Sequence, residues 1–259
     1  MEDRRKSIFI TGAASGIGLA TARLFREKGW FVGAYDLNRE GLNSLFQELG
    51  PENCIADVLD VTDRAAYQAA LDKFGLATGG KLDLLYNNAG IGVGGRFVDN
   101  NFEDVMRVVN INFVAVLSGI HLAYPLLKAT ENSLCFTTSS SSGIFGLPLI
   151  AAYSATKHAV KGLTEALSIE FSADGVRAAD VLPGTIDTPI LPDEAKQISD
   201  EKNPFRLMPP SAVAEVVWAA YHDHNRLHWY VPDDLGKLES YVVADPEAYR
   251  DRILGFFKP

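Results

Sequence analysis

Apolar residues along the chain gather in short runs, and longer stretches with helically spaced apolar positions separate these runs. Each run is apolar at nearly every position, which is typical of strands buried on both faces of a parallel sheet. Strands that alternate with helices indicate an α/β fold with helices covering both faces. The strands are predicted at residues 7–11, 30–36, 53–59, 82–86, 133–138, 176–182 and 227–231.

The stretches between the strands carry apolar residues at helical spacing, with Thr62 or Asp63 as a candidate N-cap for the third helix and Ser211 for a later one. Residues 189–208 break the alternation with prolines, charges and scattered apolar residues, so we expect a substrate-gating loop there. Residues 232–259 form a C-terminal extension, and 1–259 is predicted to be a single domain. The first helix is predicted to end at residue 28 and the second to begin near residue 38. The later helices are predicted at residues 63–74, 102–128, 151–172, 211–221 and 245–257.

Glycines at positions 12, 16 and 18 follow the first strand and open the first helix. A glycine-rich turn there lets backbone N–H groups and the helix N-terminus approach a pyrophosphate. Asp36 ends the second strand, 18 residues beyond Gly18, where a carboxylate can bind the ribose hydroxyls of a dinucleotide. The alternative for Asp36 is a cap for the helix that begins near Asn38. Glycine turn and acid together favour a Rossmann-type doubly wound fold.

The cofactor is expected to be NAD, because a 2′-phosphate would lie against the Asp36 carboxylate. No lysine or arginine precedes Gly16 in the turn, and Leu37 follows the acid. Arg39 is the nearby basic residue, and we expect it to face solvent.

Tyr153 and Lys157 lie four positions apart in a predicted helix, so their side chains share one face. An ammonium beside a phenol favours the phenolate and lowers its pKa, which suits a general acid/base acting on an alcohol oxygen. An isolated pair of this kind is more often a half-buried aromatic beside a solvated lysine. The hydroxyl run 137–142 ahead of the pair adds polar groups that could bind the same oxygen.

With the glycine turn at Thr11 and Gly12, the acid, the Asn88-Ala89-Gly90 segment and the Tyr–Lys pair in this order, the chain resembles the short-chain dehydrogenase/reductase family over residues 7–231. The resemblance implies a catalytic set, in which spacing to the tyrosine selects the serine and local context selects Asn112 over Asn110. This set is Asn112, Ser140, Tyr153 and Lys157. The implied cofactor-binding residues are Gly12, Ser15, Gly16, Ile17, Gly18, Asp36, Asp60, Val61, Asn88, Ala89, Gly90, Tyr153, Lys157, Pro183, Gly184, Ile186 and Thr188.

The family resemblance implies an NAD-dependent oxidoreductase that interconverts a secondary alcohol and a ketone by hydride transfer, with Tyr153 as acid/base. A non-catalytic NAD(H)-binding regulator on the same scaffold is the alternative, with an epimerase or a methyltransferase behind it. Large apolar residues near the site, among them Ile144, Phe145, Leu147 and Leu149, predict an apolar alcohol or ketone as substrate. The family often ends in a glycine-rich tail, which the acidic extension replaces here.

The remaining sequence features indicate which binding partners, which cellular location and which oligomeric state to expect. A net charge of −9 argues against nucleic acid and anionic membranes. The apolar segment 105–127 carries Asn110, Asn112 and His121, which indicates a buried helix and no membrane span. Three histidines at 222, 224 and 228 lack the Cys, Asp or Glu spacing of a metal site, so no metal is predicted. Two separate cysteines and a start without an apolar leader suit the cytoplasm. Apolar residues on several faces of helices 102–128 and 151–172 predict a homodimer or homotetramer.

Overall fold

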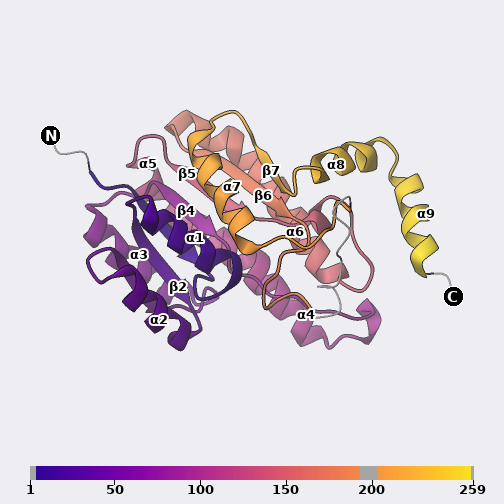
Figure 1. The fold of residues 1–259 in the computed structure, drawn as a ribbon, viewed down its shortest axis with the longest axis horizontal. Helices are drawn as coiled ribbons and strands as arrows, with labels where there is room; N and C mark the ends of the chain where they lie inside the picture. Colours follow the sequence, from indigo (N-terminus) through magenta and orange to yellow (C-terminus); the bar gives the residue numbers. More distant parts are fainter. Residues whose placement is uncertain (1–3, 193–202, 258–259) are drawn as a thin grey trace.

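The structure is a computed structural model that describes residues 4–192 and 203–257, the last two without their side chains. Its strands form one parallel sheet of seven strands in the order β3-β2-β1-β4-β5-β6-β7 (Figure 1). The fold class predicted from the sequence is therefore confirmed. The strands are β1 (Ser7–Thr11), β2 (Phe31–Asp36), β3 (Cys54–Val58), β4 (Leu84–Asn87), β5 (Leu134–Thr138), β6 (Arg177–Pro183) and β7 (His228–Val231).

Helices cover both faces of the sheet, because neighbouring residues of each strand point to opposite sides. In β1, Ile8 and Ile10 belong to the core beneath α1, α2 and α7, whereas Phe9 belongs to the core beneath α3, α5 and α6. Both faces are thus apolar, as the near-continuous apolar runs predicted. The main helices are α1 (Gly16–Glu27), α2 (Arg39–Leu49), α3 (Arg64–Thr78), α4 (Phe102–Val109), α5 (Ala115–Lys128), α6 (Ala151–Glu170), α7 (Pro210–His222), α8 (Leu235–Ala244) and α9 (Pro246–Phe257).

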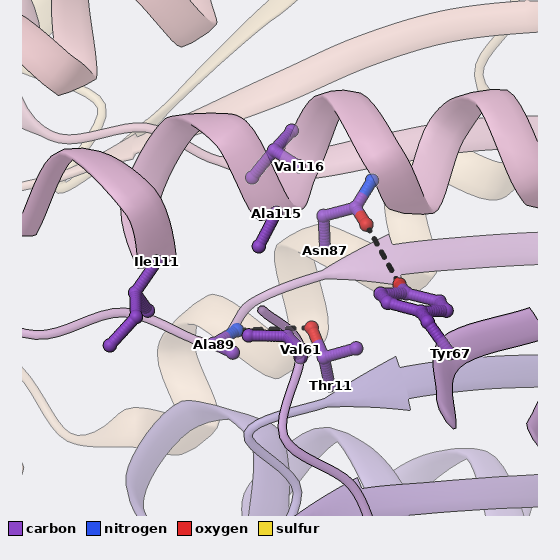
Figure 2. Close-up of a pocket in the computed structure, with 8 residues that line it drawn as sticks. All are labelled: Thr11, Val61, Tyr67, Asn87, Ala89, Ile111, Ala115 and Val116. Atoms are coloured by element: carbon purple, nitrogen blue, oxygen red, sulfur yellow. Dashed lines mark hydrogen bonds between the residues drawn. The ribbon is translucent and has the colours of Figure 1, made fainter. Parts of the chain in front are cut away.

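The strand order reverses between β1 and β4, which pair although β2 and β3 separate them in the chain. In a doubly wound sheet, ligands bind at the carboxyl ends of the strands at such a reversal. Figure 2 shows this point: the Thr11 hydroxyl accepts the backbone N–H of Ala89 at 3.1 Å, next to a cavity of about 10 Å³. The cavity holds about one water. The polar ends of β1 and β4 are therefore joined directly.

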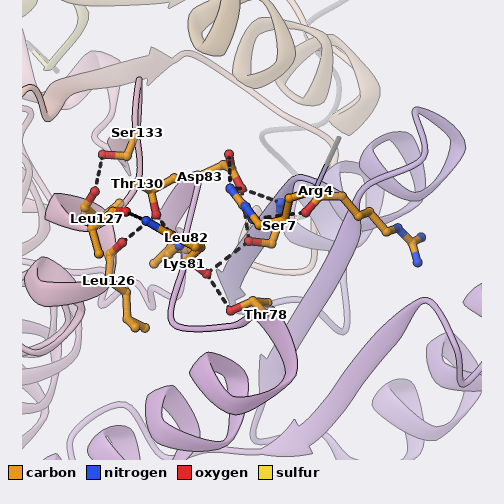
Figure 3. Close-up of polar contacts among 12 residues, drawn as sticks. Arg4, Ser7, Thr78, Lys81, Leu82, Asp83, Leu126, Leu127, Thr130 and Ser133 are labelled. Atoms are coloured by element: carbon orange, nitrogen blue, oxygen red, sulfur yellow. Dashed lines mark hydrogen bonds and ion pairs between the residues drawn. The ribbon is translucent and has the colours of Figure 1, made fainter. Parts of the chain in front are cut away.

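A polar cluster fixes the opposite, amino-terminal edge of the sheet (Figure 3). The buried carboxylate of Asp83 accepts two hydrogen bonds from Arg4, at 2.9 and 2.8 Å, and one from the backbone N–H of Ser7 at 2.8 Å. Thr130 accepts the N–H of Leu82 at 2.9 Å. A buried carboxylate is stable only when its oxygens are bonded, so this cluster ties β1 to β4 away from the ligand edge.

The predicted helix 102–128 is continuous but contains a π-turn, η2 (Asn110–Val114), between α4 and α5. This segment is long and apolar enough to cross a membrane, and 39% of its apolar 18-residue stretch is buried inside the protein. Its buried residues, including Val116, Ile120 and Ala123, pack on the sheet in the same core as Phe9. It is therefore a core helix of this fold, in agreement with the sequence-based interpretation.

Two element predictions were wrong. Ser211 is not the N-cap of α7, because the helix begins at Pro210 with Pro209 before it. Helix α8, at residues 235–244, was not predicted from the sequence. Its Leu235 and Val242 are buried against Ile144 and Leu182, and Tyr249 of α9 joins the same cluster. The extension is thus packed on the segment that follows the predicted catalytic serine.

Candidate active site

The glycine turn between β1 and α1 is tightly packed. Gly12 and Gly16 have positive φ values of 68° and 51°, which side chains rarely adopt. A Cβ at Gly18 would lie 2.0 Å from the carbonyl oxygen of Gly12. Among the described residues, no side chain caps the first turn of α1 after Ser15. Its N–H groups therefore stay available to an anion, as a dinucleotide pyrophosphate requires.

Asp36 lies at the carboxyl end of β2, beside the glycine turn. Its Oδ2 accepts the N–H of Ala14 at 3.0 Å and its Oδ1 accepts the N–H of Asn38 at 2.9 Å. Asn38 itself is the N-cap of α2, accepting from Gly41 at 3.1 Å, so the cap role that competed for Asp36 belongs to its neighbour. These two bonds fix the carboxylate at the rim of the turn. Arg39 is exposed, as predicted.

The segment after β4 lies directly under the glycine turn. The Asn88 amide donates to the carbonyl oxygens of Thr11 and Gly12, at 3.1 and 3.2 Å. A Cβ at Gly12 would stand 2.9 Å from the Cα of Ala89. Asn88 therefore pins the turn, and the predicted Asn88-Ala89-Gly90 segment reaches the predicted pyrophosphate site.

Two further groups of predicted cofactor residues border this edge. Asp60 is exposed, and its Oδ1 accepts from the N–H and hydroxyl of Thr62, at 2.9 and 2.6 Å, while Val61 lines the small cavity of Figure 2. On the other side, a Cβ at Gly16 would lie 2.9 Å from Cγ2 of Thr188. The predicted cofactor residues at the end of β6 and in the segment after it, Pro183, Gly184, Ile186 and Thr188, therefore lead back to the glycine turn. The predicted gating loop leaves beyond Thr188, and its residues 193–202 lie outside the described residues.

Asn112 is buried in the π-turn η2, whereas Asn110 is exposed. The Asn112 Oδ1 accepts the N–H of Ile91 at 2.9 Å, and the Asn112 Nδ2 donates to the carbonyl of Ile91 at 2.8 Å. The amide thus holds the loop after β4 in place. A Cβ on the intervening Gly90 would lie 3.4 Å from Asn112 Oδ1 and 3.8 Å from Lys157 Nζ, so the two predicted catalytic residues approach each other there.

Ser140 follows β5 in extended conformation and caps the short 3₁₀ turn η3 (Ser141–Gly143). Its Oγ accepts from the N–H of Ser142 at 3.2 Å and from the hydroxyl of Ser142 at 2.9 Å. The Ser140 side chain also favours the Tyr153 phenolate and so lowers the pKa of that phenol. Ser139 points elsewhere, donating to the carbonyl of Lys157 at 2.9 Å.

The expected effect of Lys157 on the Tyr153 phenol is not what the structure shows. Burial raises the pKa of Tyr153 above its ordinary value, and the Ser140 side chain offsets this in part. Lys157 Nζ donates to the carbonyl of Thr138 at 2.7 Å and lies 5.5 Å from the centre of the Tyr153 ring. Burial also lowers the pKa of Lys157 to about 8, while the charge of Asp180 opposes that shift. Helical spacing placed the two residues on one face but did not determine where the ammonium points.

Two backbone groups that were not predicted from the sequence also support this site. The carbonyl of Thr138 binds Lys157, and the backbone of Ile91 binds Asn112. Thr138 ends β5 and Ile91 lies in the loop that follows β4, and a position at the carboxyl end of a strand is the signal that could have identified them. Across 4–192 and 203–257, no group of three His, Cys, Asp or Glu could hold a metal. His228 instead lies 2.7 Å from Asp180 and 3.3 Å from Glu165.

The donor set fits a nicotinamide dinucleotide. The glycine turn has open backbone donors and no room for side chains, the fixed carboxylate of Asp36 can accept ribose hydroxyls, and Lys157 can donate to the second ribose. These groups lie along one edge of the sheet, from β2 across the reversal to β5. Next to them lie the hydroxyls of Ser140 and Tyr153, which can act on an alcohol or carbonyl oxygen, and Asn112, which holds the loop after β4.

Comparison with known proteins agrees with this geometry. Residues 6–199 match the family model described as short chain dehydrogenase, and the chain belongs to this family of oxidoreductases. A 3-oxoacyl-[acyl-carrier-protein] reductase from Thermotoga maritima is 35% identical over 218 residues, covering 82% of this chain and 88% of the relative. A cyclohexanol dehydrogenase from Acinetobacter sp. is 34% identical over 217 residues, covering 82% and 86%. A short chain dehydrogenase/reductase from Burkholderia phymatum, solved in complex with NAD, superposes with a TM-score of 0.82 at 26% identity, covering 96% of each chain.

Proposed function

We propose that the protein is an NAD-dependent oxidoreductase that interconverts a secondary alcohol and a ketone on an apolar small molecule. The observation that carries the proposal is the Tyr153 side chain with the Ser140 hydroxyl near it and Lys157 Nζ 5.5 Å from the centre of its ring, because the two hydroxyls can both bind one substrate oxygen. The cyclohexanol dehydrogenase among the relatives acts, by its name, on such an alcohol. A non-catalytic regulator would not need this pair of hydroxyls beside a buried lysine.

The bound nicotinamide supplies the position that accepts or gives the hydride. For reduction, the Tyr153 phenol donates its proton to the carbonyl oxygen, and for oxidation its phenolate takes the hydroxyl proton. The hydroxyl of Ser140 donates to the same oxygen and holds it in reach. Because burial raises the pKa of Tyr153, the phenol is protonated at neutral pH, which is the form that reduction requires. Oxidation should therefore become faster as the pH rises.

Lys157 and Asn112 support this chemistry. One N–H of the Lys157 ammonium is used on the Thr138 carbonyl, which leaves the others for the nicotinamide ribose hydroxyls. The amide of Asn112 is bonded at both ends to Ile91, so it fixes the loop that carries Gly90 beside Lys157. Its role is to keep this wall of the site in place.

The substrate remains proposed to be apolar, although the supporting residues change. Ile144 is buried in the cluster with α8, and Phe145 packs on Tyr249 with ring centres 4.9 Å apart. Phe145 and Leu147 also line a groove of about 540 Å³ that borders α6 and α9 and includes neither Ser140 nor Tyr153. The support now rests on the exposed Ile190, near the loop at Gly92, and on Leu149. A 3-oxoacyl thioester, a ketone of the same reaction class, is a second candidate because of the Thermotoga relative.

The test is turnover of a panel of secondary alcohols and ketones, including cyclohexanol and a 3-oxoacyl thioester, followed by NADH absorbance in both directions. Tyr153→Phe removes only the phenolic oxygen and should lower kcat by roughly 10²–10⁴-fold, the usual range for general acid/base catalysis. NADH binding, followed by its fluorescence, should stay near the wild-type value. A Tyr153→Phe protein that turns over substrate at the wild-type rate would show that another group moves the proton.

The preference for NAD over NADP is proposed from Asp36 alone. A 2′-phosphate there would lie near a carboxylate, and like charges at 4 Å repel by about 1 kcal/mol in water and about 4 kcal/mol at a dielectric of 20. We expect kcat/KM to favour NAD by ~10²-fold or more. Asp36→Ala should reduce this preference, measured with one substrate and both cofactors. Equal use of both cofactors by the wild type would leave Asp36 with only its structural bonds to Ala14 and Asn38.

A further inference from the structure

Ser142 lies two residues beyond the predicted catalytic serine and is 2% exposed. Its hydroxyl donates to Ser140 Oγ at 2.9 Å, and its backbone N–H donates to the same oxygen at 3.2 Å. A serine hydroxyl has two acceptor lone pairs and one proton. Both acceptor positions of Ser140 are therefore filled by Ser142, and only the proton of Ser140 remains to make a further bond.

The turn that carries Ser142 is fixed to the catalytic helix. A Cβ at Gly143 would lie 3.0 Å from Ser139 Oγ and 3.1 Å from the carbonyl oxygen of Lys157. Ser139 Oγ donates to that same carbonyl at 2.9 Å. With the turn held this closely and Ser142 buried, its hydroxyl cannot turn out to solvent. The packing of η3 on α6 therefore keeps the Ser142 hydroxyl on Ser140 Oγ.

We propose that Ser142 is a positioning residue that makes Ser140 an obligatory hydrogen-bond donor toward Tyr153 and the substrate oxygen. A serine whose lone pairs are free could rotate and accept a proton from the substrate alcohol or from the phenol. With Ser142 in place, the proton of Ser140 points to the oxygen that becomes negative during reduction. Such a donor, oriented before the reaction, stabilises developing charge without reorganisation. A chain of hydrogen bonds also strengthens its last member.

This inference rests on the proposed function, because it concerns how Ser140 serves that reaction. Ser142→Ala removes the hydroxyl donor and keeps the backbone N–H. We expect kcat to fall about tenfold, the equivalent of one hydrogen bond, while the Kd for NADH stays within about twofold. Ser142→Thr, which keeps a hydroxyl, should recover most of the rate. Ser141→Ala is the matched control on the same turn, where the Ser141 side chain is half-buried, and it should leave kcat unchanged.

A double-mutant cycle separates positioning from a merely structural role. If Ser142 acts through Ser140, Ser142→Ala should have no further effect on kcat in a Ser140→Ala background, because the group that it orients is gone. Independent losses that multiply in the double variant would overturn the proposal. A general loss of stability caused by Ser142→Ala would lower kcat in both backgrounds, so the cycle distinguishes it from an effect that requires Ser140.

A second readout needs no substrate. Tyr153 can be titrated by the ultraviolet absorbance of phenolate, as the difference between each protein and its Tyr153→Phe counterpart. Ser142→Ala should raise the pH at which Tyr153 ionises by roughly half a unit to one unit, because the bond from Ser140 to the phenolate weakens. The charged groups near this phenol, Lys157 and behind it Asp180, are the same in both proteins. An unchanged ionisation pH of Tyr153 in Ser142→Ala would overturn the Ser142 proposal. Turnover by Tyr153→Phe at the wild-type rate would instead overturn the proposed function.

Discussion

At the scale of single residues, Lys157 is a buried ammonium that binds the Thr138 carbonyl and is expected to bind the nicotinamide ribose. It is 4% exposed and already bonded to the Thr138 carbonyl, so its remaining N–H groups are directed by the protein. Lys157→Met keeps the length of the side chain and removes the charge. We expect a loss of both kcat and NADH affinity, measured by turnover and fluorescence titration. Normal NADH binding by the variant would contradict the ribose contact.

Lys157 should also affect how the free energy of unfolding depends on pH. Burial lowers its pKa to about 8 from 10.5, so the folded protein releases this proton at a lower pH than the unfolded chain does. Between these two values the unfolded state binds more protons, and the free energy of unfolding therefore rises with pH. Relative to Lys157→Met, the wild type should gain up to about 3 kcal/mol across this window in urea unfolding. Parallel curves for the two proteins would contradict a buried ammonium.

The residues of the site differ in how far the sequence determined them. Gly12, Gly16 and Gly18 could be predicted because backbone geometry excludes other residues at those positions. The direction of the Tyr153 pKa could not be predicted from helical spacing, because the long side chain of Lys157 reaches a carbonyl on β5 that only the folded sheet brings near. Spacing fixes the face of a helix, whereas tertiary contacts fix where a flexible side chain ends.

At the scale of elements, the alternating strands and helices were predictable because apolar runs require burial on both faces of the sheet. The π-turn at Asn112 was not, since it arises together with the two bonds to Ile91, far from η2 in the sequence. Helix α8 was not predicted, and Pro232 before it and Gly236 in its first turn are poor helix formers. Its burial depends on the cluster with Ile144 and Leu182, which sequence periodicity alone does not reveal.

The C-terminal extension is predicted to be part of the stable fold. Leu235 is fully buried in the cluster that supports the segment after Ser140. Leu235→Ala should lower the free energy of unfolding by about 2–5 kcal/mol, the usual cost of a buried leucine-to-alanine change. Val243→Ala on the same helix, at a residue that is 75% exposed, should change it by less than about 0.5 kcal/mol. Equal, small effects in urea unfolding would mean that α8 is only loosely attached.

At the scale of the whole molecule, we propose a homodimer, or a homotetramer that contains the same contact, through α4–α5 and α6. Among the described residues, Met106, Val114 and Leu117 are 38%, 44% and 38% exposed along the helix formed by α4, η2 and α5, and Ile169 on α6 is 75% exposed. The opposite side of that helix is buried on the sheet. An apolar stripe facing away from the core is typical of a subunit interface.

The interface can be tested by charge. Val114→Glu with Leu117→Glu would place carboxylates at the centre of the proposed contact, where burying an unpaired charge is strongly unfavourable. We expect the wild type to sediment as an oligomer at micromolar concentration and this variant as a monomer, each with unchanged helix content. Leu76→Glu is the matched control, because Leu76 on α3 is 87% exposed and lies outside the proposed contact. It should leave the oligomer intact. A wild-type protein that sediments as a monomer would refute the proposal, and dissociation of the Leu76→Glu protein would place the contact on another face of the molecule.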